Sequence, residues 1–204
     1  MAEADFRFVP LVCGQCTGRM AAGKKQVLYQ CHVCGGVWEC SGGKLLSKEM
    51  IRFSGSGDIH LPFWHATFSI TCLEGIINDT AGFMKICGSV KVSDMSSAPP
   101  HLFIPAFSLP LQQAIKLGRN MTVRFPSFLL ASVQDSLVEP VTLSEADAPL
   151  MAEMILLASL VEELRTSRSF LASFSVQLTS LAPVSIPFTR KESRLLQLEM
   201  NLEI

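Results

Sequence analysis

The sequence predicts an α+β fold in which a small N-terminal module with its linker, residues 1–57, precedes a mainly antiparallel sheet with helices on one face, residues 58–204. Three observations predict this fold. Two Cys-x-x-Cys pairs lie close together near the N-terminus. Several later segments alternate apolar and small polar residues, as half-buried strands do. One long segment carries an apolar stripe at helical spacing, and such a helix needs a sheet to cover its apolar face.

Four of the seven cysteines form the two pairs, with fourteen residues between them: Cys13, Cys16, Cys31 and Cys34. Each pair can present two thiolates to one ion at about 2.3 Å, and two pairs complete a tetrahedron. The residues between the pairs predict a hairpin that turns at Gly23–Lys25 and returns as a strand over 26–30. Because four thiolates leave no open coordination position, we expect one structural ion and no catalytic one.

This stretch, residues 11–40, resembles the zinc-ribbon family, in which two cysteine knuckles on facing hairpins hold one structural Zn²⁺. Gly35 and Trp38 follow the second pair, as similar residues do in many ribbons. The resemblance implies zinc, although four thiolates also suit iron. It leaves the activity open, because ribbons occur in transcription factors, ribosomal proteins, enzymes and scaffolds.

Other uses of the cysteines fit the sequence less well. A redox pair begins a helix in a βαβ pattern, whereas glycine and β-forming residues flank both pairs here. His32 and Cys40 lie close enough in sequence to be substitute ligands, but we expect an exposed histidine and a free thiol. Cys72 and Cys87 have apolar neighbours and are expected to be small core residues.

The Gly/Ser run at 54–58 is the expected boundary between the two parts, and residues 44–53 before it form a strand or a helical turn. Residues 61–73 alternate over a long segment rich in aromatic and β-branched residues, which predicts a strand. Pro62 then occupies an edge or first position of that strand. Residues 83–92 are ambiguous, and residues 101–107 predict a short apolar strand.

Two helices are expected in the second part. Ser108 caps the first, which has Pro110 in its first turn and ends at Gly118. The second runs from Glu145 to about Arg165 after an approximate capping box of Ser144 and Asp147. Its apolar stripe comprises Leu150, Met154, Leu157, Val161 and Leu164, with Met151, Ile155 and Ala158 beside it. The segments 170–188 and 194–204 then alternate as two strands joined at 189–193.

An apolar residue, a proline and a phenylalanine recur in four places: Leu61-Pro62-Phe63, Ile104-Pro105-Ala106-Phe107, Phe125-Pro126-Ser127-Phe128 and Ile186-Pro187-Phe188. The recurrence indicates repeated strand starts, with a duplicated sheet unit as the alternative. Together with the cysteine module, these motifs resemble uncharacterised bacterial proteins that carry an N-terminal zinc ribbon and an α+β C-terminal domain. That resemblance implies an architecture and no activity.

The surface is expected to be poor in charge. Hydrophobic residues make up 49% of the 204, and charged residues make up 17% against an average of ~25%. The most apolar stretch, 149–164, contains three glutamates, so it does not predict a membrane span. Acidic residues occupy positions 3 and 5, where a signal peptide needs basic ones. We therefore expect a cytoplasmic protein with part of its surface covered by a partner protein or by a second copy.

No catalytic signature is present in the sequence, so we expect a protein that is not an enzyme. His60 and His65 are five residues apart on one strand and therefore face opposite sides of the sheet. His101 follows two prolines and is expected at the surface. The adjacent Glu162 and Glu163 point in different directions on a helix and form a solvated face.

Two roles that do not involve catalysis stay open. Ribbons often present a hairpin to nucleic acid, and Arg19, Lys24 and Lys25 lie on this one. However, strong phosphate binding commonly uses six or more contacts, and the formal net charge is −1. We therefore favour a protein-interaction role, in which the ribbon is a rigid recognition element and the charge-poor second part is a docking surface.

Overall fold

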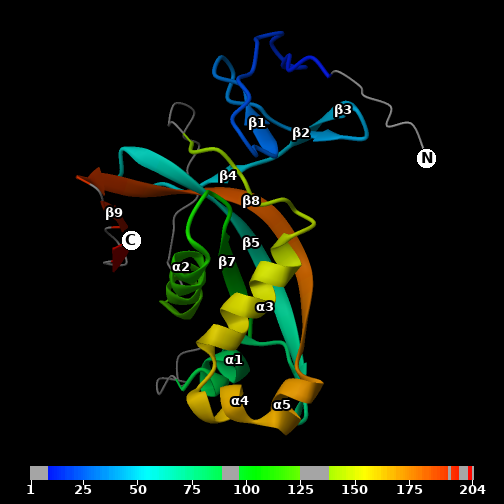
Figure 1. The fold of residues 1–204 in the computed structure, drawn as a ribbon, viewed down its shortest axis with the longest axis vertical. Coiled ribbons are helices and arrows are strands. Elements are labelled where there is room, and N and C mark those ends of the chain that lie inside the picture. Colours follow the sequence, from blue (N-terminus) through cyan, green and yellow to red (C-terminus); the bar gives the residue numbers. More distant parts are fainter. Residues whose placement is uncertain (1–8, 89–96, 125–137, 193, 198–201, 204) are drawn as a thin grey trace.

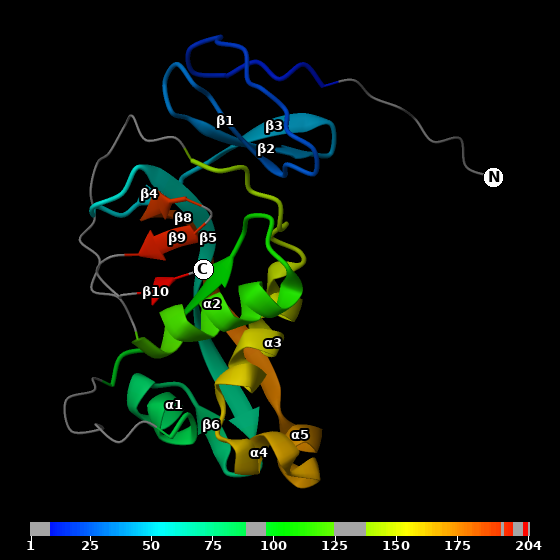
Figure 2. The same cartoon turned by 60° about the vertical axis from the view of Figure 1, so that its left-hand side comes forward.

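The computed structural model describes residues 9–88, 97–124, 138–192, 194–197 and 202–203 (Figure 1). It contains helices, a small antiparallel sheet and a larger, mainly antiparallel sheet, which confirms the α+β class. Figure 2 shows the small sheet at one end of the molecule, with α1, α4 and α5 at the other. No helix within the described ranges is both long enough and apolar enough to cross a membrane.

The small sheet carries the cysteine module. Its antiparallel order is β1-β2-β3, with the bounds Leu28–Gln30, Val37–Ser41 and Lys44–Lys48. Gly42 and Gly43 connect β2 to β3 with φ of 57° and 75°, the conformation that tight two-residue hairpins require. Leu28 and Val37 are buried in the same cluster as Trp64 of the larger sheet, so the module packs onto the main core.

The larger sheet is organised around two long strands, β5 (Ile59–Cys72) and β8 (Ser175–Lys191). They pair antiparallel along nearly their whole length, with a β-bulge between Thr67 and Phe68 (Figure 1). The shorter strands flank them: β4 (Ile51–Arg52), β6 (Gly75–Ile77), β7 (His101–Pro105), β9 (Arg194–Gln197) and β10 (Leu202–Glu203). Only β4, which runs parallel to β8, departs from the antiparallel pattern among these pairings.

Five helices accompany the sheet in the described residues: α1 (Thr80–Ile86), α2 (Leu111–Arg124), α3 (Ala148–Ser159), α4 (Glu162–Thr166) and α5 (Arg168–Ser173). The core forms where α3 covers one face. There, every second side chain of β5 from Trp64 to Ile70 is buried with Ile155 and Leu156 of α3. The predicted strand at 61–73 is therefore correct, and it begins two residues earlier.

The predicted end of α2 at Gly118 is wrong, because the helix continues to Arg124. Gly118 is buried where α2 crosses α3, and a Cβ atom there would lie 2.4 Å from Cδ1 of Ile155. The glycine is present for close packing between helices and does not end the helix. Without the contact partner, a glycine in this pattern is typical of a helix end.

The predicted helix from 145 to 165 is two helices with a break at Leu160 and Val161. Both residues have extended backbone, and the Val161 N–H donates to the Ile86 carbonyl of α1 at 3.1 Å. Leu160 is buried beside Phe170. The predicted stripe is also displaced: Leu150 is 67% exposed, and the buried positions are Ala148, Ala152, Ile155, Leu156 and Ser159.

Near the C-terminus, residues 168–173 form α5, where a strand was predicted from Phe170. Ser167 caps this helix, and its hydroxyl accepts the Phe170 N–H at 3.3 Å. The strand β8 then runs through the predicted joint at 189–193 as far as Lys191. The alternating pattern thus predicted residues 175–188 correctly as a strand. It was wrong for residues 170–173, which belong to α5.

The recurring proline–phenylalanine motifs meet in space. The Phe63 ring packs edge-on against Phe107 at a centroid distance of 5.8 Å and stacks with Phe188 at 6.2 Å. Pro62 lies inside β5, opposite Ser185 of β8, and not at the edge or first position that was predicted. The motif at 125–128 lies outside the described residues. Three of the four motifs therefore build one aromatic cluster.

Candidate metal centre

The fold brings the sulfur atoms of Cys13, Cys16, Cys31 and Cys34 together, all within 4.8 Å of one another. Cys13 Sγ lies 3.5 Å from Cys34 Sγ, and Cys16 Sγ lies 3.4 Å from Cys31 Sγ. A tetrahedral Zn²⁺ with bonds of ~2.3 Å separates its sulfurs by ~3.8 Å. The four cysteines can therefore hold one metal ion, and their number and softness suit zinc.

The two cysteine knuckles have the same backbone hydrogen bonds. In the first, the Thr17 N–H donates to the Cys13 carbonyl at 2.9 Å, and the Cys13 N–H donates to the Gly18 carbonyl at 2.9 Å. In the second, Gly35 and Gly36 do the same for Cys31 at 2.9 and 2.8 Å. Each knuckle is thus a turn closed by two main-chain hydrogen bonds, and it places its two sulfurs in the cluster.

Glycine leaves room beside the sulfurs at the last position of each knuckle. A Cβ atom at Gly18 would lie 3.3 and 3.4 Å from the sulfurs of Cys16 and Cys31. A Cβ atom at Gly36 would lie 3.4 Å from Cys34 Sγ. The nearest neighbours of such Cβ atoms would be Val33 Cγ2 at 3.0 Å and Gln15 Oε1 at 2.7 Å, so a larger residue at either glycine would displace the side chains packed around the sulfurs.

The site is half enclosed. Cys13 and Cys31 are buried with Met20 and Trp38, whereas Cys34 is exposed. The Trp38 ring lies over the first knuckle so closely that a Cβ atom at Gly14 would come within 2.6 Å of it. Sequence reasoning noted Trp38 as a ribbon feature but did not find this contact. Gly14, inside the first Cys-x-x-Cys pair, could have indicated that a large side chain packs closely against this knuckle.

Backbone N–H groups, burial and neighbouring thiols lower the pKa of some of the four cysteine thiols and raise that of others. Burial raises the pKa of Cys13, but the backbone N–H groups of Cys16 and Gln15 outweigh it and lower this pKa to about 6. The Gly18 N–H lowers the pKa of Cys16, but the Cys31 thiol and burial raise it to about 12 overall. Because thiolates are the ligands, binding of a divalent cation releases the protons that remain on the sulfurs.

The substitute ligands considered from the sequence stay apart from this cluster. His32 and Cys40 are exposed, and neither belongs to the four-sulfur group. Cys72 is buried beside Leu160 and Phe170, as expected for a small core residue. Cys87 is half-buried, and burial raises the pKa of its thiol to about 12.

Three contacts fasten the cysteine module to the rest of the protein. The Val27 N–H donates to the Val141 carbonyl at 2.9 Å. Arg52 Nη2 of β4 donates to the Gly35 carbonyl of the second knuckle at 3.0 Å. Lys48 Nζ binds Glu145 Oε2 at 2.8 Å, ahead of α3. These contacts fix the orientation of the module relative to β5 and α3.

Three of the four histidines, His60, His65 and His101, lie on strands of the larger sheet, away from the cysteine cluster. His60 Nδ1 lies 3.3 Å from Ser185 Oγ, in the buried region. His65 Nε2 lies 2.9 Å from His101 Nδ1, so one ring donates to the other. Burial and the neighbouring His101 lower the pKa of His65 to about 4. His101, predicted at the surface, is half-buried, because β7 pairs with β5 beside His65.

Comparisons with known proteins return no relative. No family model matches the chain, no curated protein matches it, and no solved structure matches it. The function is therefore argued from the site and the surfaces of this chain.

Proposed function

We propose that this chain is a non-catalytic zinc-binding protein that acts as a protein-interaction module or a subunit of a complex. The observation that carries the proposal is the convergence of four cysteine sulfurs within 4.8 Å on two closed knuckles. Four thiolates fill a tetrahedral shell and leave no position for water or substrate, so the ion stabilises the fold of the ribbon.

Exposed apolar side chains on the ribbon support the interaction role. Val33, inside the second Cys-x-x-Cys pair, is 74% exposed, and Val12 beside the first pair is 40% exposed. Leu46, on the outer strand of the small sheet, is 48% exposed. A rigid, metal-bound surface that presents apolar side chains matches the composition of an interface centre better than that of a solvated surface.

A nucleic-acid role is the second candidate, because Arg19, Lys24 and Lys25 are all exposed on the ribbon. Three cations on a chain with a net charge of −1 provide fewer phosphate contacts than strong binding commonly uses. The interaction role is therefore the conclusion, and salt-sensitive nucleic-acid binding is the outcome that would replace it.

The metal is tested by elemental analysis of protein purified without added zinc. We expect one zinc per chain, lost in the Cys31→Ser/Cys34→Ser variant together with the folded ribbon, because structural zinc supplies folding free energy. Cys40→Ser is the matched control and should keep the ion, since Cys40 lies outside the cluster. One zinc per chain retained by the double variant would exclude the four-cysteine site, and one iron would reassign the ion.

The interaction role is tested by native purification of the tagged chain from its own source. We expect one stoichiometric protein partner that is lost with Val33→Asp and kept with Leu150→Asp, a control equally exposed but on α3. In parallel, fluorescence anisotropy with oligonucleotides measures the alternative. Salt-sensitive binding that disappears when Arg19, Lys24 and Lys25 are changed to Glu would overturn the interaction proposal.

A further inference from the structure

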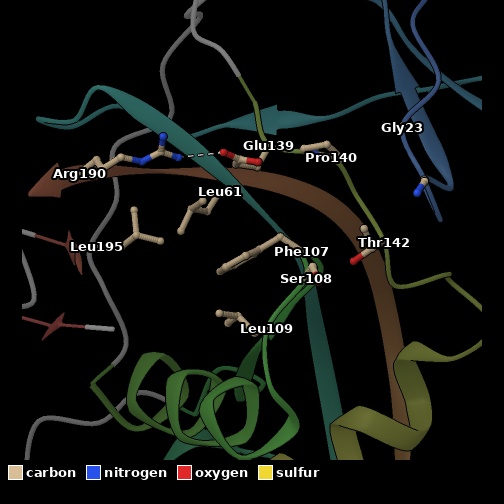
Figure 3. A pocket seen from close by; sticks show the side chains of 11 residues that line it. Gly23, Leu61, Phe107, Ser108, Leu109, Glu139, Pro140, Thr142, Arg190 and Leu195 are labelled. Carbon is tan, nitrogen blue, oxygen red and sulfur yellow. Dashed lines mark hydrogen bonds and ion pairs between the residues drawn. The ribbon is translucent and has the colours of Figure 1, made fainter. Parts of the chain in front are cut away.

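A cavity of about 370 Å³ lies where the ribbon meets the larger sheet (Figure 3). Its volume is at the small end of the range of ~300–1,000 Å³ that is typical of small-molecule sites. The cavity is separate from the four cysteines, and none of them lines it. The cavity is therefore a second site, distinct from the metal centre.

The cavity walls come from six separate stretches of the chain, and main-chain hydrogen bonds hold several of them together. Gly23 and Lys24 belong to the turn of the ribbon hairpin, and the Val27–Val141 hydrogen bond holds that hairpin against residues 138–143. The Thr142 N–H in turn donates to the Ala106 carbonyl at 2.6 Å. The walls are thus preformed by main-chain contacts, which lowers the entropic cost of binding.

The inner wall is apolar and only partly covered by the protein. Figure 3 shows Phe107, Leu109 and Leu195 around one space, with Leu61 behind them. Leu61 is buried, whereas the other three are half-buried and pack at the rim of the core. A hydrocarbon group in this space would remove apolar surface of Phe107, Leu109 and Leu195 from water, which is the main favourable term in binding.

The rim carries an excess of positive charge. Arg190 Nη2 binds Glu139 Oε1 at 3.0 Å, and the Arg190 side chain is still 56% exposed. A guanidinium has five N–H donors, so this ion pair leaves donors for a second carboxylate. Lys24 lines the same cavity from the ribbon turn and is exposed. Two cations against one carboxylate favour an anion at the mouth.

We propose that this cavity binds a small free carboxylic acid with a medium-length hydrocarbon chain. The chain packs on Phe107, Leu109 and Leu195, and the carboxylate lies at the mouth between Lys24 and Arg190. The ribbon supplies one of the two cations and the larger sheet supplies the other, so the ligand contacts both parts of the protein.

Isothermal titration calorimetry with octanoate, below the concentration at which it forms micelles, tests the proposal on the full chain. We expect saturable binding of one octanoate per chain. Octyltrimethylammonium, with the same tail and the opposite charge, should bind at least about tenfold more weakly. Equal binding of the two amphiphiles, or no saturable binding of octanoate, would overturn the proposal.

Two matched pairs of variants locate the site. Lys24→Glu should weaken octanoate binding roughly tenfold, because attraction becomes repulsion, whereas Lys25→Glu next to it should not. Leu109→Glu places a charge on the apolar wall and should abolish binding, whereas Leu111→Glu, two residues away and 46% exposed, should not. Equal effects within either pair would mean that octanoate binds elsewhere. If Leu109→Glu does not fold, the comparison of Lys24→Glu with Lys25→Glu alone locates the site.

Discussion

At the scale of single residues, the two knuckles place different side chains in the same backbone conformation. Thr17 has a φ of 60° and Gly35 has a φ of 72°, each four residues after the first cysteine of its pair. Glycine adopts this left-handed region without cost, whereas a β-branched residue pays roughly 1–2 kcal/mol. The first knuckle therefore tolerates strain that the second avoids.

Gly35→Val should consequently destabilise the zinc-loaded protein by roughly 1–2 kcal/mol, since it forces a β-branched residue into the left-handed region. Urea unfolding at saturating zinc measures this loss. Thr17→Gly is the matched control at the equivalent position, and it should cause no such loss. If both variants lose stability equally, backbone strain at this position is not the cause.

The paired histidines make stability depend on pH. An unfolded histidine titrates near pH 6.5, whereas the pKa of His65 in the folded chain is about 4. Below pH 6.5 the unfolded chain therefore takes up a proton that the folded chain does not, so the contribution of His65 is complete above pH 6.5 and is lost as the pH falls towards 4. The His101 ring faces His65 from β7, with 2.9 Å between His101 Nδ1 and His65 Nε2.

His65→Phe should reduce the loss of unfolding free energy between pH 7 and pH 4.5 by roughly 1–2 kcal/mol, a modest figure because water still reaches this half-buried pair. Phenylalanine keeps a ring against Phe103, which lies 5.0 Å from the His65 ring in the native chain. Urea midpoints of both proteins at each pH give the difference, and acid loss of zinc is common to both. Identical pH profiles would exclude His65 as the titrating group.

At the scale of elements, the packing of α2 on α3 depends on the missing side chain of Gly118. A Cβ atom there would lie 2.4 Å from Ile155 Cδ1 and 3.1 Å from the Phe103 carbonyl oxygen. Because Ile155 Cδ1 is the end of a side chain, shortening it should relieve part of the conflict. The carbonyl of β7 cannot withdraw without disturbing the pairing with β5.

Gly118→Ala should therefore destabilise the protein by about 1–3 kcal/mol through overpacking. At an exposed helical position the same change would instead stabilise the helix by about 1 kcal/mol. The double variant Gly118→Ala/Ile155→Val should recover part of the loss. Thermal unfolding of the four proteins in this cycle measures the coupling. Additive losses would show that the two side chains do not conflict.

The elements that the sequence predicted correctly are those governed by local pattern. The alternation over 61–73 and the short apolar segment at 101–107 predicted β5 and β7 because each pattern reports burial on one strand. The Cys-x-x-Cys spacing predicted the metal cluster for the same reason, since each knuckle is a local turn. The predicted capping box is formed only in part: the Asp147 N–H donates to Ser144 Oγ at 3.1 Å, but α3 begins at Ala148 with Asp147 as its N-cap residue.

What the sequence did not predict depends on contacts between distant segments. The role of Gly118 requires Ile155, and the break at Leu160 requires the hydrogen bond from Val161 to α1. The pairing of His65 with His101 follows from the register of β7 on β5, which no single-segment pattern encodes. The cavity at the ribbon turn is likewise absent from any local motif, because six separate stretches of the chain line it.

At the scale of the whole molecule, the low charge of the sequence has a partial explanation in the fold. Many of the apolar residues form a core that extends from Leu28 and Val37 of the small sheet to Phe83 and Met84 of α1. Other apolar side chains are exposed, among them Val33 on the ribbon and Leu73 and Ile76 at the β5–β6 hairpin, the last two 64% and 68% exposed.

Removal of zinc with a chelator should release the ribbon while leaving the larger sheet paired. Hydrogen exchange should rise over residues 11–48 and over 138–143, which the Val27–Val141 hydrogen bond joins to the ribbon. The amides between β5 and β8 should stay protected, because their partners do not include the ribbon. A uniform rise across both regions would show instead that the ion stabilises the chain as one cooperative unit.

The attachment of the ribbon turn beside Pro140 has a thermodynamic consequence. A molecule that contacts both the turn and the larger sheet favours the conformation in which the knuckles are closed, and a metal ion on the four cysteines would favour the same conformation. The two binding equilibria are then linked, and each must change the affinity of the other by the same factor. In such a protein, the affinity for the organic ligand would depend on the metal concentration. The affinity for the metal would likewise depend on the ligand concentration.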